Sequence, residues 1–223
     1  MIETGSHQRE RSLTVLVVIE AIELFVLAPL SATNGAPFLL VGSIIVANVA
    51  AVLAVVWHTR SAVIAVVLAT ATETAAVVLR FVEPSQRTEA LDFAAALILL
   101  VALTVVLGVA VFGPGRVTIH RILGAIAIYL NVAAAFALAY RVIATFGPGR
   151  FSPTPAVSPS HAIADFVYFS FTTLTTTGFG DIVPVDPFAR SITNVESVIG
   201  QLFPATLLAR LITLELEHRR ELP

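Results

Sequence analysis

The sequence contains no cysteine and no lysine, and it carries few charges of either sign. Without cysteine the chain has no disulfide framework, no thiolate nucleophile and no cysteine-ligated metal. All thirteen basic residues are arginines, and because they form no clustered run, nothing supports a nucleic-acid-binding face. The five histidines lack the i, i+4 spacing of helical metal ligands. We therefore expect neither a metal centre of that kind nor an enzyme.

The composition is that of a membrane protein. Charged residues make up 13% of the chain, whereas ordinary globular domains carry about 25%. Hydrophobic residues make up 57%, and the mean hydropathy is +0.91. We expect a chain this apolar to cross a lipid bilayer several times.

Six segments are each about long enough to cross a bilayer core, at about 1.5 Å per helical residue. They are Leu13–Leu30, Pro37–Trp57, Ser61–Val82, Leu91–Phe112, Val117–Phe146 and Pro187–Glu217. The first could instead be a cleaved signal peptide, but Glu20 and Glu23 interrupt it and favour a membrane helix. The pattern predicts an all-α integral membrane protein with six transmembrane helices and one re-entrant segment before the last.

Residues 171–181 read FTTLTTTGFGD, a threonine run followed by two glycines one residue apart. Glycine enters the left-handed region of backbone conformation without steric cost. With Gly178 and Gly180 in that region, neighbouring carbonyls turn to one side. Several copies around an axis would then form oxygen rings that replace the hydration shell of a potassium ion. A glycine-rich turn is the simpler interpretation, but the threonines and the flanking apolar helices favour a filter.

TTTGFGD resembles the selectivity filter of the tetrameric potassium channels, whose usual form is T-V-G-Y-G-D. The match continues without a gap through Pro184, Arg190 and Gly200, over about the last hundred residues. The resemblance implies a homotetramer, because one filter strand cannot surround an ion. It implies potassium ligands at Thr176, Thr177, Gly178 and Phe179, followed by Gly180 in the filter and Asp181 at the outer mouth.

The motif departs from the family pattern at two positions. Phe179 stands where tyrosine is commoner, so a hydrogen bond behind the filter is lost. Many relatives brace the outer aspartate with an acidic residue on the pore helix, and the matching position is Thr172. We expect filter support from Thr172, Tyr168, Thr173 and Glu196. Glu196 faces either the back of the filter, with the Thr172 and Thr173 hydroxyls as partners, or the cavity, and we favour the first.

The inner helix carries the expected gating and cavity positions. Gly200 aligns with the hinge glycine of the family. Pro204 lacks an N–H, and its ring clashes with the Gly200 carbonyl four residues earlier, which predicts a bend. Gln201, Pro204 and Leu208 share one helical face and would line the cavity.

The resemblance divides the chain into a cytoplasmic N-terminus, a four-helix membrane domain and a pore module, at residues 1–12, 13–112 and 113–223. The pore module is expected to contain an outer helix, a turret, a pore helix, a filter and an inner helix, at residues 117–146, 147–160, 161–175, 176–181 and 187–217. Arginines favour the side that holds both termini, which predicts cytoplasmic termini in a plasma or inner membrane.

The four-helix domain resembles a voltage-sensor bundle without its gating charges. The part of its fourth helix from Ala94 to Phe112 has no charged residue, so we expect no steep voltage dependence. The intramembrane charged residues that we single out are Glu20, Glu23, Glu73 and Arg80, with Arg141 of the fifth helix within reach. We interpret them as a structural ion-pair network. A proton or ligand sensor is the alternative, with a lipid or a quinone as the candidate ligand.

These features predict a channel that conducts K⁺ passively, without a conventional voltage sensor and without an organic cofactor. Two alternatives stay open. One is a membrane sensor or receptor in which the pore is only structural, and the other is a weakly selective cation channel.

Overall fold

The structure is a computed structural model, and it describes residues 14–30, 49, 60–112, 119–147, 149–153 and 159–220. Residues 14–30 form a helix that contains a π-helical stretch, η1, at Glu23–Leu27. The other elements, in chain order, are α4 (Arg60–Val82), α5 (Gln86–Phe112), α6 (Ile119–Phe146), β1 (Phe151–Ser152), α7 (Pro159–Leu174), β2 (Val183–Pro184) and α8 (Pro187–Arg220). The predicted helical fold class is therefore confirmed for the described part of the chain.

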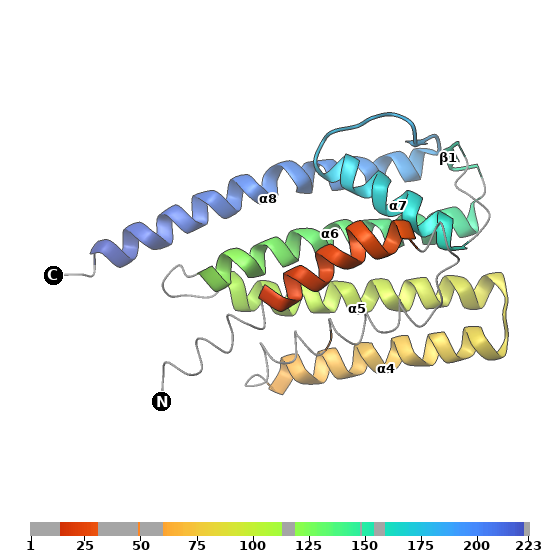
Figure 1. Ribbon diagram of the computed structural model, residues 1–223, viewed down its shortest axis with the longest axis horizontal. Helices are drawn as coiled ribbons and strands as arrows, with labels where there is room; N and C mark the ends of the chain where they lie inside the picture. Colours follow the sequence, from red (N-terminus) through yellow and green to blue (C-terminus); the bar gives the residue numbers. More distant parts are fainter. Residues whose placement is uncertain are drawn as a thin grey trace.

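The long helices lie side by side, with α5 packed between α4 and α6 (Figure 1). The short helix α7 packs against both α6 and α8 at one end of the molecule. An aliphatic core joins the helix at residues 14–30 to α4, α5 and α6. A second core, rich in aromatic rings, joins α6, β1, α7 and the start of α8. The second core is the one that supports the loop after α7.

Three of the described helices are long and apolar enough to cross a membrane, at Arg60–Val82, Gln86–Val109 and Arg121–Phe146. In the first of them only 17% of the most apolar window is buried inside the chain, so most of its apolar surface needs lipid or another apolar partner. The predicted crossing at Pro37–Trp57 lies outside the described residues, apart from Val49. Six crossings therefore stay a prediction.

A short antiparallel ladder closes the chain around α7. β1, before α7, pairs with β2, after the loop, so that Phe151 lies opposite Pro184. Two residues later, Asp186 Oδ1 accepts hydrogen bonds from the N–H groups two and three positions ahead, at 3.0 and 3.1 Å. This cap, with Pro187 at the first helical position, starts α8. Both ends of the α7–loop segment are thereby anchored to the helices around it.

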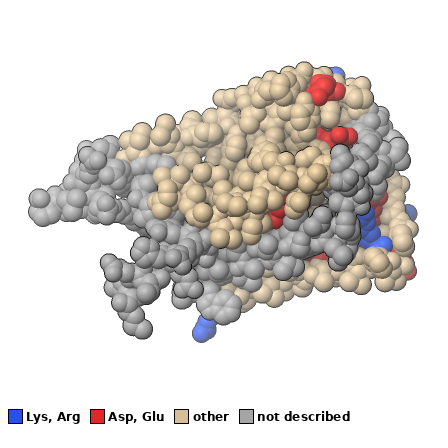
Figure 2. Space-filling view, in the orientation of Figure 1, with Lys and Arg blue, Asp and Glu red and all other residues tan. Residues whose placement is uncertain are grey.

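Charged side chains are unevenly distributed. On the face shown in Figure 2, most of them gather at the end of the molecule that carries α7 and β1 in Figure 1, and the visible helix surfaces are largely uncharged. This distribution suits helices whose middle lies in a membrane.

Candidate functional site

The last turns of α7 hold the loop that follows. The Thr172 carbonyl accepts hydrogen bonds from the N–H groups of Thr177 and Gly178, at 2.8 and 3.1 Å. The Thr173 carbonyl accepts one from the Thr176 N–H at 2.9 Å. These bonds satisfy carbonyls that the end of a helix leaves unpaired. Two of the expected filter supports, Thr172 and Thr173, thus contact the loop through their backbone.

Left-handed backbone alternates along this loop. The φ angle is 56° at Thr176, 57° at Gly178 and 81° at Gly180, so every second residue is left-handed. The two glycines lie where the sequence predicts them to be needed. Thr176 is an additional left-handed position, and for a β-branched residue this conformation costs about 1–3 kcal/mol. Contacts from outside the loop are therefore required to hold Thr176.

Asp181 is braced by Tyr168 of α7. The Tyr168 hydroxyl donates to Asp181 Oδ2 at 2.7 Å, and its ring stacks on Phe179 with centroids 6.2 Å apart. The hydroxyl of Thr172, the position at which the sequence suggested a missing brace, instead donates to the Phe169 carbonyl at 2.9 Å. The hydrogen bond to Asp181 also raises the pKa of the Tyr168 phenol. Tyr168 belongs to α7, which is too short to span a membrane.

Glu196 of α8 is completely buried. Its carboxylate accepts a hydrogen bond from the Tyr140 hydroxyl of α6 at 2.5 Å and another from the Ser170 hydroxyl of α7. These partners take the place of the Thr172 and Thr173 hydroxyls that we expected, because Glu196 faces the side of α7 that packs on α6. Sequence reasoning did not predict Tyr140 as a partner of Glu196. The available signal was that a buried tyrosine in an apolar helix usually has a hydrogen-bond partner.

At Gly200, α8 and the end of α7 come into very close contact. A Cβ added to Gly200 would lie 1.9 Å from the carbonyl oxygen of Leu174, the last residue of α7. Gly200 is therefore required for packing, whether or not it is also a hinge. The next residue, Gln201, donates from Nε2 to Thr176 Oγ1 at 2.8 Å. On the same expected face, Pro204 lies inside the continuous helix α8, and Leu208 is exposed in the single chain.

The expected charge network has other partners. Arg80 of α4 pairs with Asp92, and Arg141 of α6 pairs with Glu89, each at 2.5 Å. Both guanidinium carbons lie over the Phe93 ring, at 5.5 and 5.2 Å from its centroid. All three partners belong to the first turns of α5. Sequence reasoning missed Glu89 because it lies before the predicted range Leu91–Phe112, and it missed Asp92 and Phe93 because the search for charges in this helix began at Ala94.

The acidic residues that we expected as partners lie elsewhere. Glu20 and Glu73 are buried, and Glu23 lies in η1. Among the described residues, both carboxylate oxygens of Glu20 and one of Glu73 have no hydrogen-bond partner. Arg80 and Arg141 therefore do not join these two carboxylates into the expected network, since both arginines pair with α5 instead.

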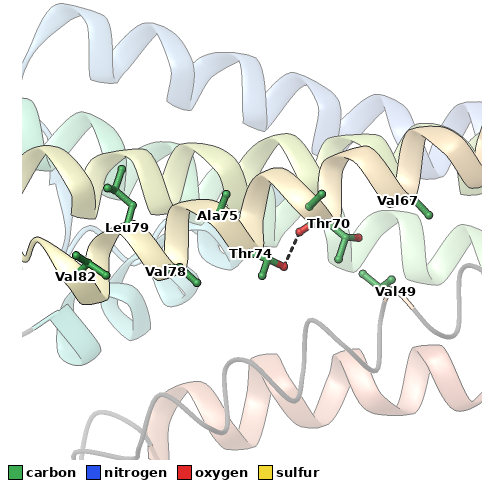
Figure 3. A pocket seen from close by; sticks show the side chains of 9 residues that line it. Val49, Val67, Thr70, Thr74, Ala75, Val78, Leu79 and Val82 are labelled. Atoms are coloured by element: carbon green, nitrogen blue, oxygen red, sulfur yellow. Dashed lines mark hydrogen bonds between the residues drawn. The ribbon is translucent and has the colours of Figure 1, made fainter.

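An apolar groove of about 830 Å³ runs along α4 (Figure 3). Aliphatic and threonine side chains of α4 between Val67 and Val82 line it, together with Val49. The Thr70 and Thr74 hydroxyls donate to carbonyls of their own helix, at 2.8 Å each, so they offer no free donor. The described part of the chain contains no group of three or more His, Asp or Glu side chains that could hold a metal ion.

Comparison with known proteins places the loop in context. Residues 117–216 match a family model described as ion channel. Protein LctB of Bacillus caldotenax is 27% identical over 127 residues, which cover 56% of this chain and 93% of that protein. Two pore potassium channel c of Oryza sativa subsp. japonica is 36% identical over 75 residues, 34% of this chain and 16% of that protein. Protein LctB of Geobacillus stearothermophilus is 30% identical over 80 residues, 34% of this chain and 59% of that protein. No solved structure matches.

The matched residues contain α6, α7, the alternating loop and most of α8. This part of the molecule matches an ion channel domain, in a chain whose described residues include three helices long and apolar enough to cross a membrane. Over these residues the chain is similar to an ion channel family model and to a potassium channel, which supports a relation to the potassium channel superfamily.

Proposed function

We propose that the chain is a potassium-selective channel in which four copies surround a central pore. The observation that carries this proposal is the alternation of left-handed backbone at Thr176, Gly178 and Gly180. In four copies it would stack the carbonyls of residues 176–179 into oxygen rings, with the Thr176 hydroxyl as an inner ring. Potassium ions would shed water into these rings and move by mutual repulsion between adjacent sites.

The exposure of the loop supports the homotetramer. Residues 175–181 are exposed in the single chain, as are Gln201, Pro204 and Leu208 of α8. Irregular backbone is not tolerated against lipid, so neighbouring copies or a water-filled pore must cover it. We expect the purified protein to have about four times the 23.6 kDa mass of one chain. A monomer under all detergent conditions would contradict this.

The helices before the pore module are proposed not to sense the membrane voltage. The part of α5 from Ala94 to Phe112 carries no charge to move in an electric field, so we expect shallow voltage dependence. Both termini are proposed to lie in the cytoplasm, on the side favoured by the arginines. The α4 groove is proposed to accept a lipid acyl chain, because its lining is apolar and its described threonine donors are already used.

Ion flux into liposomes tests the proposal. Wild-type protein should pass potassium and exclude sodium, and Gly178→Asp should abolish the flux. Gly149→Asp is the matched control, because Gly149 also has a positive φ, 80°, and nothing within 4 Å of an added Cβ, but lies before β1, outside the loop. Gly149→Asp should conduct like the wild type. Equal sodium and potassium flux would favour the weakly selective channel, and no flux at all would favour the sensor.

A further inference from the structure

Gln201 lies where α8 passes against the end of α7. Its neighbour Gly200 has no side chain, and this lets the α8 backbone approach the Leu174 carbonyl to within a distance that no Cβ would allow. The close approach brings Gln201 within reach of the loop. The Gln201 Nε2 is 2.8 Å from Thr176 Oγ1, and it is the donor of that hydrogen bond.

Thr176 is the loop residue that most needs outside support. Gly178 and Gly180 adopt positive φ without strain, whereas Thr176 is β-branched and has a φ of 56°. Its own N–H is held by the Thr173 carbonyl at 2.9 Å, which fixes one side of the residue. The hydrogen bond from Gln201 fixes the side chain from a different helix.

We propose that Gln201 is a positioning residue for the innermost ion site, where it holds the Thr176 hydroxyl and, through it, the left-handed backbone at Thr176. The inference rests on the proposed channel function. A hydroxyl oxygen has two lone pairs. The amide N–H occupies one of them and limits rotation of the side chain, so the other lone pair stays available to a cation.

A simpler alternative is that Gln201 only makes the cavity polar. In that case any amide at position 201 would serve equally well, and its reach would be unimportant. If the hydrogen bond matters, the length of the side chain matters too. Asparagine is one methylene shorter and cannot span the same distance from the α8 backbone to Thr176 Oγ1. The two explanations therefore differ in what they expect of Gln201→Asn.

Barium block of potassium flux is a suitable probe. Ba²⁺ is close to K⁺ in size and carries twice the charge, so it binds tightly to a cage of oxygen atoms. We expect Gln201→Asn and Gln201→Leu each to weaken barium block in liposomes by about fivefold or more, the effect of one lost hydrogen bond on an equilibrium. The melting temperature in detergent should stay near wild type, and barium block is expressed relative to each variant's own potassium flux without barium.

Thr206→Val is the matched control. The Thr206 hydroxyl is on α8, but among the described residues it bonds only to carbonyls of its own helix, at 2.8 and 3.1 Å, so its loss should leave barium block unchanged. If Gln201→Leu fails to fold, Gln201→Asn alone decides. Asparagine equal to wild type, or unchanged block in both variants, would overturn the inference. Absence of potassium flux in wild-type protein would overturn the proposed function and this inference with it. Wild-type flux with unchanged barium block in the variants would overturn the inference alone.

Discussion

Replacing Gly200 with alanine should force α8 away from the end of α7. The added Cβ would lie 1.9, 2.7 and 3.0 Å from the O, C and Cα atoms of Leu174. Because all three are backbone atoms, no rotation of a side chain relieves the clash. Ordinary contact begins at 3.4 Å, so the two helices must separate by about 1.5 Å. Overpacking of this kind costs about 1–3 kcal/mol.

The same separation should impair conduction. It would stretch the 2.8 Å hydrogen bond between Gln201 and Thr176 and move the end of α7, which holds the loop through the Thr172 and Thr173 carbonyls. We expect Gly200→Ala to lower the unfolding midpoint in detergent and to reduce potassium flux into liposomes by tenfold or more. Leu174→Ala should not rescue it, since the clash is with the backbone.

Gly108→Ala is the control for this substitution. Gly108 lies in α5, and an added Cβ there meets nothing within 4 Å. Alanine is the better helix former, so Gly108→Ala should be neutral or stabilising by up to about 1 kcal/mol. A pure hinge at Gly200 would change channel opening without changing stability. Gly200→Ala protein that is as stable and as conductive as wild type would refute the packing argument.

Three further substitutions test contacts around the loop. Tyr168→Phe keeps the ring but removes the 2.7 Å hydrogen bond to Asp181, and it should lower the potassium-to-sodium flux ratio; an unchanged ratio would show that the brace is dispensable. Tyr140→Phe leaves buried Glu196 with one donor fewer and should cost about 1–3 kcal/mol in thermal unfolding, whereas a neutral result would contradict the bond. Phe93→Leu removes the ring that both guanidinium groups lie over and should cost about 0.5–2 kcal/mol by the same measurement, and an unchanged midpoint would count against these cation–π contacts.

Sequence reasoning was most successful where the signal is local. The length of an apolar run predicts a helix, and α4, α6 and α8 begin and end within a few residues of the predicted ranges. A glycine at every second position predicts left-handed backbone, and Gly178 and Gly180 both have positive φ. Both signals are contained in a few consecutive residues, so no knowledge of the tertiary packing was needed.

The partners of the polar groups could not be predicted in the same way. Glu196 meets Tyr140 and Ser170, which are 56 and 26 positions away in the sequence. Which face of an almost wholly apolar helix turns toward its neighbour depends on packing, and hydropathy alone does not distinguish the faces. Asp181 shows the same limit, because the resemblance directed attention to Thr172 while the brace comes from Tyr168, one turn earlier on α7.

Besides the Thr172 and Thr173 carbonyls, three groups of side-chain contacts from different helices support the loop. Tyr168 of α7 holds the residue after the second glycine, Gln201 of α8 holds Thr176, and Glu196 joins α6, α7 and α8 behind α7. Since these contacts share α7, their effects should not be additive. Loss of one of these contacts should leave α7 in place and weaken potassium binding only at the loop residue that the contact supports. Loss of Glu196 together with Gln201 should cost more than the sum, because α8 would then lose both of these side-chain hydrogen bonds to α7 and the loop.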